Sequence, residues 1–508
     1  MGYNIINKTE EFMNIFKKIG AAALSVATAA SCLALTASAE TKEYKLLTSP
    51  ISVNSVSGNF ALTDKGIISV DTEKWQKDGE FAYSDVKTDF DASKYTGIYF
   101  DGSSNYGHLS GKNNYLSFKY DKNSKSVKTV KDFGENCYGF NGENAYYWNF
   151  DQDSKTMTLT VTAPDGTSKS NSLTYTGNGE WYAGLSTIKN DKYVAAILWK
   201  TDVKEDEGYE KFLYDVYGIT KDGKMETIFS RTTGNGAVAW GAFGVAAGNN
   251  CFSWTEEAAA LGLKRFIVNL DTKEVIKGSA SLSDLGYDVK CKYTDGMGDA
   301  RISGVDLYGD RFIAECVTDY TTDSYDYRYI LFKIEDQGYL WEDYAGVSKT
   351  YKSMSTNDGK IFLVKTEDDK WGYIDANGKE LALFDDAANF VGDYAPVVKG
   401  GKAYLIDRNM KCVSEKIDAD GVRSISNISD MFVIEKGGKT YLATFAAPAS
   451  EPTTSEPTSE PTSEPTSEPT SEPASEPENP DTGVAGIGFA VAIAALGSAG
   501  IILSRKKK

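Results

Sequence analysis

The chain has 508 residues, a formal net charge of −18 and a single histidine, His108. Nucleic acid and anionic lipid surfaces repel an acidic chain, so both are excluded as partners of its main domain. One histidine cannot build a Ser-His-Asp or Cys-His site by itself, and no Gly-rich phosphate loop opens a helix. We expect His108 to lie in a turn or at the surface.

Residues 1–39 have the pattern of a signal peptide. A lysine pair precedes an apolar, alanine-rich stretch that closes with Ala37-Ser38-Ala39, a small-any-small cleavage pattern. We therefore expect export, with Glu40 as the first residue of the mature protein. Met1 and Met13 both remain candidates for the start of the chain, because the residues after Met13 form the better basic region.

Residues 40–448 form the globular part, and their pattern predicts an all-β fold. Only two prolines occur between Pro50 and Pro448, and tyrosines and β-branched residues are frequent. Glycine-bearing turns such as Ala376-Asn377-Gly378-Lys379 recur at short intervals, and such pairs accept the positive φ of tight hairpin turns. One short helix is expected, from Thr255 to Leu261.

A polar pair followed by an aromatic or aliphatic strand recurs along this part. From Asn59 to Asp430 is 371 residues over eight steps, or about 46 residues per step, which suits four-stranded propeller blades. We predict a β-propeller-like array of about seven or eight blades, because radial closure also protects strand edges. Tandem β-sandwiches are the alternative. The pairs are Gly58-Asn59, Asn113-Asn114, Glu143-Asn144, Asn190-Asp191, Asn249-Asn250, Gly309-Asp310, Asp358-Gly359, Gly392-Asp393 and Ser429-Asp430.

The sequence indicates neither a metal site nor a cofactor. The Asp89/Asp91 and Asp151/Asp153 pairs have the ligand chemistry of calcium sites, but neither sits in a loop with the closing glutamate. The second pair is better interpreted as a hairpin turn. The five cysteines of the mature chain show no zinc spacing and are interpreted as buried thiols. A disulfide between Cys291 and Cys316 remains open.

The segment Asp369-Lys370-Trp371-Gly372-Tyr373-Ile374-Asp375 is followed by Ala376-Asn377-Gly378-Lys379 and later by Tyr394-Ala395-Pro396-Val397. This order resembles a unit of the tryptophan-glycine (WG) repeat family. Lys402 to Lys411 resembles a second unit, with Ala-Tyr in place of Trp-Gly. The resemblance covers about 350–445, and it implies β-hairpin repeats and a binding role without naming any catalytic residue.

The C-terminal segment consists of a stalk, a pentapeptide, an apolar run and a positive tail. Residues 449–478 repeat Ser-Glu-Pro-Thr, which predicts a disordered, extended spacer. Residues 484–504 are apolar and are followed by four cations at 505–508, the pattern of one transmembrane helix with a cytoplasmic tail.

The pentapeptide between stalk and apolar run is Asn479-Pro480-Asp481-Thr482-Gly483. With its flanks it resembles the sorting signal of Gram-positive cell-wall proteins, whose pentapeptide is Leu-Pro-any-Thr-Gly. The resemblance implies that a sortase cleaves after Thr482 and joins its carbonyl to the peptidoglycan. Asn479 departs from the family's leucine, so a membrane anchor that is never cleaved is the alternative.

Together these features predict an extracellular, surface-anchored, non-enzymatic binding or adhesion protein for glycan or protein ligands. Aromatic side chains stack on sugars and anchor interfaces, and they also fill cores. A glycoside-active propeller enzyme with paired carboxylates is the alternative function. The candidate ligand-binding residues are Trp181, Tyr182, Trp199, Trp240 and Trp254.

Overall fold

The computed structural model describes most of residues 43–446 and is almost entirely β. By its internal contacts the chain separates into Met1–Tyr44 and Lys45–Lys508, and the description concerns the second unit. The predicted signal peptide, stalk, sorting motif and apolar run lie outside the described residues. Within 43–446, the residues that are not described are 103, 113, 135–138, 142–143, 152, 164, 175–182, 188–189, 191, 207–208, 233–236, 259–261, 290–299, 321–324, 336–343 and 426–429.

The described strands form nine sheets, which are numbered here in chain order. The first four contain, in turn, β2 (Ser55–Ser57), β3 (Phe60–Thr63), β4 (Gly66–Val70) and β5 (Tyr83–Asp85); β6 (Lys87–Thr88), β7 (Gly97–Asp101), β8 (Tyr106–Ser110), β9 (Tyr115–Asp121) and β10 (Ser126–Gly134); β11 (Gly139–Asn141), β12 (Asn144–Asp151), β13 (Thr156–Thr162) and β14 (Ser168–Thr174); and β15 (Ala183–Thr187), β16 (Tyr193–Asp206), β17 (Tyr209–Thr220) and β18 (Met225–Thr232).

The other five sheets follow the same plan. They contain, in turn, β19 (Ala237–Gly248), β20 (Cys251–Ala258), β21 (Gly262–Asn269) and β22 (Val275–Ser279); β23 (Arg301–Tyr308), β24 (Arg311–Tyr320), β25 (Tyr325–Ile334) and β26 (Tyr344–Gly346); β27 (Ser353–Ser355), β28 (Ile361–Lys365), β29 (Trp371–Asp375) and β30 (Glu380–Phe384); β31 (Asp386–Ala387), β32 (Tyr394–Lys399), β33 (Lys402–Asp407) and β34 (Ile417–Asp418); and β35 (Gly421–Ser424), β36 (Met431–Lys436), β37 (Lys439–Ala446) and β1 (Lys45–Ser52).

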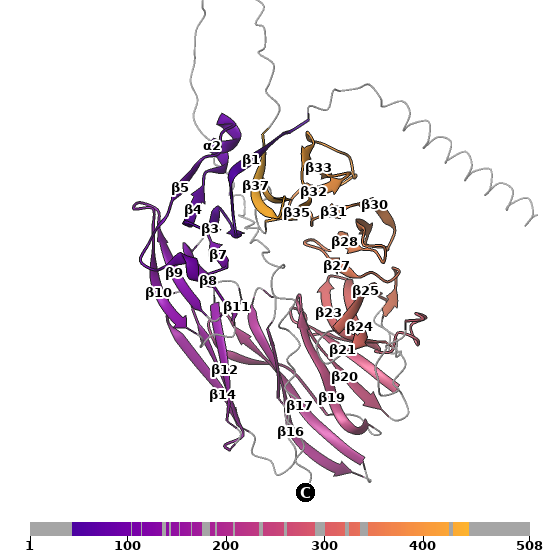
Figure 1. Ribbon diagram of the computed structural model, residues 1–508. Helices are drawn as coiled ribbons and strands as arrows, with labels where there is room; N and C mark the ends of the chain where they lie inside the picture. Colours follow the sequence, from indigo (N-terminus) through magenta and orange to yellow (C-terminus); the bar gives the residue numbers. More distant parts are fainter. Residues whose placement is uncertain are drawn as a thin grey trace, which may run out of the picture. The chain divides into compact units, whose positions relative to one another are not determined.

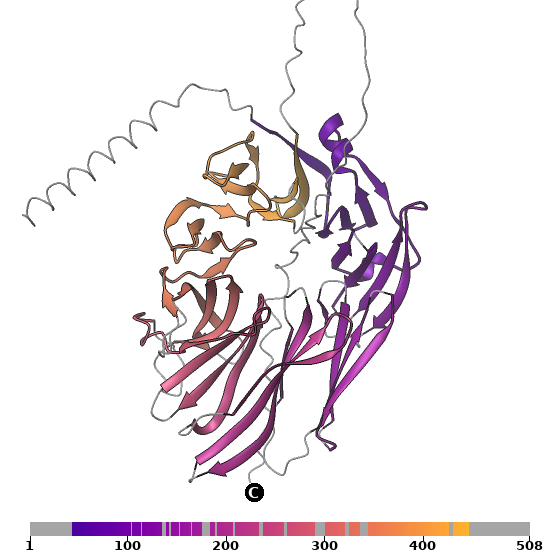
Figure 2. The same cartoon turned by 180° about the vertical axis from the view of Figure 1, so that it is seen from behind.

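The sheets are arranged around a ring, as in a β-propeller (Figures 1 and 2). Eight of them are built from consecutive strands, so the number of sheets lies close to the seven or eight blades predicted. The ninth joins the two ends of the domain, because β1 pairs antiparallel with β37 from Lys45 opposite Ala446 to Ser52 opposite Tyr441. This pairing closes the ring with strands almost 400 residues apart in the sequence, and it excludes tandem sandwiches.

A hydrophobic core lies at each junction between neighbouring sheets, so the ring is packed all the way round. Burial of apolar side chains is the main favourable term in holding such sheets together. The last junction, between the ninth and first sheets, buries Leu47, Ala61 and Leu442. The other eight cores contain, going round the ring, Phe60 with Leu109, Tyr115 with Ala145, Leu159 with Ile197, Tyr193 with Phe252, Ile267 with Phe312, Ile313 with Phe362, Tyr373 with Ala395, and Leu405 with Phe432.

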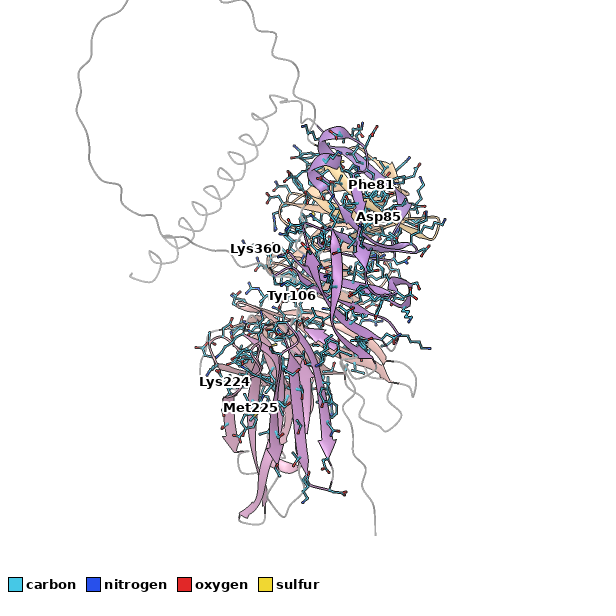
Figure 3. All side chains as sticks on the ribbon, turned by 90° about the vertical axis from the view of Figure 1, so that its left-hand side faces the viewer. Phe81, Asp85, Tyr106, Lys224, Met225 and Lys360 are labelled. Carbon is cyan, nitrogen blue, oxygen red and sulfur yellow. The ribbon has the colours of Figure 1, made fainter. Side chains whose placement is uncertain are left out.

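The recurring polar pairs mark one kind of turn, as the sequence pattern suggested. Eight of the nine pairs fall between the first and second strand of a sheet, from Asn59 before β3 to Asp430 before β36. The exception is Asn113-Asn114, which falls between β8 and β9. Tyr106, which follows the β7–β8 turn of the second sheet, and Lys360, which lies in the β27–β28 turn of the seventh, are on the same side of the ring in Figure 3. These turns therefore share one face, called the turn face below.

The two WG-like units that begin at Asp369 and Lys402 lie in the seventh and eighth sheets. Gly372 is required where β29 meets β30, because a Cβ there would lie 2.5 Å from the carbonyl oxygen of Ala382. The fully buried Tyr373 donates a 2.7 Å hydrogen bond to the carbonyl of Ala388. Asp375 and Asp407 each accept two backbone N–H bonds of 2.9 Å in equivalent turns. The two units thus have the same local structure, as their sequences predicted.

The structure corrects the predicted helix. Thr255 to Ala258 belong to strand β20, where Thr255 pairs with Arg265 of β21. The α-helix of the described part is instead α2 (Thr72–Asp78), and a 3₁₀ turn, η1, covers Ala92–Lys94. No helix among the described residues is long and apolar enough to cross a membrane.

The structure also corrects the prediction for the single histidine, whereas two of the cysteines are buried thiols, as predicted. His108 lies within strand β8, stacked on Tyr99 with ring centroids 4.7 Å apart, and burial lowers its pKa to about 3. Cys251 and Cys316 are fully buried free thiols, so Cys316 forms no disulfide, and Cys291 lies outside the described residues. Asp151 accepts backbone bonds inside the predicted hairpin turn.

Candidate binding cleft

Of the sequence-predicted ligand residues, the structure describes the side chain of Trp254 and the strand positions of two others. Trp199 lies on β16 and Trp240 on β19. Trp254 is fully buried between the fourth and fifth sheets, with its ring parallel to that of Phe266 at 5.5 Å. Its face fills the core and is closed to a ligand. The following predicted site residues lie outside the described part of the chain: Ala37, Ala39, Glu40, Trp181, Tyr182, Asn479, Pro480, Asp481, Thr482 and Gly483.

A polar cleft of about 370 Å³ lies on the turn face. It draws residues from three neighbouring sheets: most belong to the first sheet and its helix, Tyr120 and Lys125 belong to the second sheet, and Asp430 belongs to the ninth. A cleft of this size falls within the range of small-ligand sites, although its lining is far more polar than is usual for them. Its lining residues are Asn59, Ser69, Val70, Asp71, Thr72, Glu73, Ser84, Tyr120, Lys125 and Asp430.

Helix α2 holds three of these residues in place. Asp71 caps the helix, since its Oδ1 accepts the backbone N–H of Lys74 at 3.0 Å. One turn later Trp75, only 1% exposed, enters the core between the ninth and first sheets and anchors the helix. Thr72 and Glu73 therefore lie at the cleft on a helix that cannot shift without moving a buried indole.

The second sheet supplies one aromatic ring and the only cation among the described residues of the lining. Tyr120 packs edge-on against Phe60, with ring centroids 4.8 Å apart, and against Phe100 at 5.9 Å. Lys125 lies in the turn between β9 and β10, and its Nζ donates a 3.0 Å hydrogen bond to the hydroxyl of Ser84 on β5. This bond ties the second sheet to the first across the cleft, so both sides are held in a defined position.

Elsewhere on the turn face, polar residues of the same turns join neighbouring sheets. Asn190 of the fourth sheet donates a hydrogen bond to Asn250 of the fifth. Arg408 of the eighth sheet donates a 2.6 Å hydrogen bond to the carboxylate of Asp358 of the seventh, and the two form an ion pair. The usual use of this turn is therefore structural, and these contacts are called turn latches below.

A second polar cluster is buried between the fifth and sixth sheets. Arg265 is fully buried and donates to Thr255, Ser253 and the carbonyl of Ser303. Nearby, Glu315 accepts hydrogen bonds from Ser303 at 3.3 Å and from the hydroxyl of Tyr329 at 3.1 Å. Burial raises the pKa of Glu315, while the hydrogen bonds and the charge of Arg265 oppose the rise. These residues do not line the cleft, so we assign them to stability.

No metal centre is found in the described part of the chain, where no three His, Cys, Asp or Glu side chains come together as ligands. The cleft itself was missed by the sequence analysis. Asn59 and Asp430 belong to two of the recurring polar pairs, but the same signal occurs in sheets that make turn latches. Nothing local in the sequence distinguishes the two uses.

Comparison with known protein families supports the resemblance to the WG repeat family. Residues 371–402 match the family described as WG containing repeat. No curated protein matches the chain. Similar solved structures include BamB from Moraxella catarrhalis, with 9% identity, a TM-score of 0.32 and coverage of 68% of this chain and 96% of that chain.

Two further similar structures are the Dos1 propeller and lmo1340 of Listeria monocytogenes. The first has 8% identity and a TM-score of 0.32, covering 79% of this chain and 94% of that chain. The second has 11% identity and a TM-score of 0.29, covering 59% and 88%. Scores this low support no argument about function. The chain thus carries a WG containing repeat at 371–402, inside a propeller that its own strand pairing defines.

Proposed function

We propose that the protein is exported and displayed on a Gram-positive cell surface, where its propeller is a non-enzymatic binding or adhesion domain. The observation that carries the binding role is the cleft on the turn face. It gathers polar side chains from three sheets beside the ring of Tyr120, and the Asp71 cap and the buried Trp75 fix helix α2 at the cleft. Preorganised polar groups in a concave site are what recognition of a small polar ligand requires.

Display at the surface rests on the two ends of the sequence. The small-any-small pattern ending at Ala39 directs export, and the stalk at 449–478 separates the domain from the apolar run at 484–504. Cleavage after Thr482 by a sortase would join the chain to peptidoglycan. Mass spectrometry of the mature protein tests this step, because a chain that retains Gly483 and the residues after it contradicts it.

The binding role is tested with residues 40–450, which contain all nine cores between Lys45 and Ala446 and hence the complete ring. This fragment is applied to a glycan array and to extracellular protein extracts. Saturable binding without turnover supports the proposal. Turnover of a bound glycan that is lost when Glu73 and Asp430 become amides would instead support the alternative, a glycoside-active enzyme with paired carboxylates. Absence of any saturable ligand contradicts the binding role.

A further inference from the structure

We infer that the cleft binds an uncharged or amino-bearing sugar unit of a glycan and discriminates against sugars that carry carboxylate or sulfate. This inference rests on the proposed binding role and names the ligand class of the same site. It is carried by three observations on the lining: which polar groups have no protein partner, what charge they add up to, and how little apolar surface they include.

The first observation is that the side chains of the two turn residues lining the cleft, Asn59 and Asp430, form no turn latch. Asn59 and Asp430 lie in this turn of the first and ninth sheets, one residue before the second strand, whereas Asn190 and Asp358 lie three residues before it in the fourth and seventh sheets. The side chains of Asn190 and Asp358 bond the next sheet. Those of Asn59 and Asp430 make no protein hydrogen bond within the described part of the chain, although both line the cleft. Their polar groups are therefore available to a ligand.

The neighbouring polar groups are uncommitted in the same way. The hydroxyl of Thr72 is buried and has no hydrogen-bond partner among the described residues, and the Thr72 side chain is only 6% exposed. Buried polar groups without a partner are costly and uncommon in folded proteins. Ser69 and Glu73 likewise make no side-chain hydrogen bond to any described residue. A cleft with this many open donors and acceptors fits a ligand that is itself rich in hydroxyl groups.

The second observation is the charge of the lining. Asp71, Glu73 and Asp430 contribute −3 and Lys125 contributes +1, which leaves −2. Carboxylates accept hydrogen bonds from hydroxyl and ammonium groups, but they repel other anions. Uronic acids, sialic acids and sulfated sugars are therefore disfavoured, whereas neutral sugars and amino sugars are accepted.

The third observation separates a sugar from a peptide anchor. Protein interfaces rely on apolar and aromatic side chains that enter dry pockets. Here Val70 and the edge-packed ring of Tyr120 supply the apolar side chains, and the other eight lining residues are polar or charged. A volume of about 370 Å³ is at the lower end of small-ligand sites, which limits the occupant to a short stretch of a glycan.

The experiment measures binding of the 40–450 fragment to neutral, amino-bearing and acidic glycans, for wild type, Glu73→Gln and Asp430→Asn. Asp393→Asn is the matched control, because Asp393 occupies the same turn in the eighth sheet, outside the cleft, with a side chain that is 85% exposed. Each cleft variant loses a charged acceptor and should bind about tenfold more weakly or worse. The control should bind within about twofold of wild type, and thermal unfolding should show that all four proteins are folded.

The outcomes distinguish this inference from the binding role on which it rests. Glycan binding that the cleft variants do not weaken would leave the binding role in place and overturn the assignment to the cleft. A preference for acidic or sulfated glycans would overturn the charge argument. Saturable binding of a cationic peptide or a protein with no glycan binding would also overturn the inference, while the proposed binding role would stand.

Discussion

Replacing the buried Arg265 by methionine should strongly destabilise the propeller. Its guanidinium donates hydrogen bonds of 2.9 Å to Thr255, 2.7 Å to Ser253 and 2.8 Å to the carbonyl of Ser303, which joins the fifth sheet to the sixth. Methionine has a comparable stem but no donor. Loss of one partner from a buried charged network costs about 3–5 kcal/mol. We expect a loss in this range, because the three bonds are not additive.

The same substitution should make stability depend more steeply on pH. Burial raises the pKa of Glu315, and the charge of Arg265 limits that rise. A carboxyl whose folded-state pKa lies above its unfolded value loses stability as pH rises between the two values. Without Arg265 the folded-state pKa is higher still, so the loss continues to higher pH. The difference between wild type and variant should therefore be larger at pH 8 than at pH 5.

Urea unfolding of the 40–450 fragment at the two pH values measures both effects, provided that the m-value is unchanged. The double variant Arg265→Met with Glu315→Gln is the matched control, because removing the buried carboxyl should recover part of the loss at pH 8. A loss below about 1 kcal/mol, or a loss that is equal at pH 5 and pH 8, would refute the assignment of this network to stability.

Three further predictions concern single side chains. Gly372→Ala should cost about 1–3 kcal/mol, because its Cβ would lie 2.5 Å from the carbonyl oxygen of Ala382, whereas Gly102→Ala, with nothing within 4 Å, should be close to neutral; urea midpoints compare the two. Thr72→Val removes a buried hydroxyl without a partner among the described residues, so the unfolding temperature should stay constant or rise, and a fall of several degrees would contradict the open hydroxyl. His108 has a folded-state pKa of about 3 against an ordinary value of 6.5, so its contribution to folding stability is present above pH 6.5 and is lost as pH falls toward 3. His108→Gln should therefore flatten the dependence of stability on pH in this window, by up to about 1.4 kcal/mol per pH unit. An unchanged slope would argue against burial of the ring.

The features predicted correctly from the sequence are local ones. Turn residues act through the φ and ψ of two or three positions, so polar pairs such as Gly58-Asn59 and Gly392-Asp393 could be assigned to turns without knowing their neighbours. The WG-like unit is equally local, because Gly372 and the turn at Asp375 depend on strands that follow one another directly. The propeller follows from the repetition of such units.

The errors arose where a side chain's surroundings decide its state. Thr255 begins a stretch with helix-forming residues, yet it pairs with Arg265 in a buried strand, where tertiary packing overrides helix propensity. Trp254 shows no sequence sign of its burial, and His108 shows none of its half-buried place in a strand, because any aromatic or imidazole ring can face either the core or solvent. Their roles depend on which sheet lies opposite them.

The sequence by itself therefore determined an all-β chain of hairpin units, the recurrence of a polar pair along it, and the WG-like repeat. Only the tertiary structure decided that β1 closes the ring against β37, and that Asn59, Tyr120 and Asp430 meet around one cleft. The reason is that turn and strand preferences act over a few residues. Closure and the cleft depend on contacts between residues up to about 400 positions apart, for which the local pattern carries no signal.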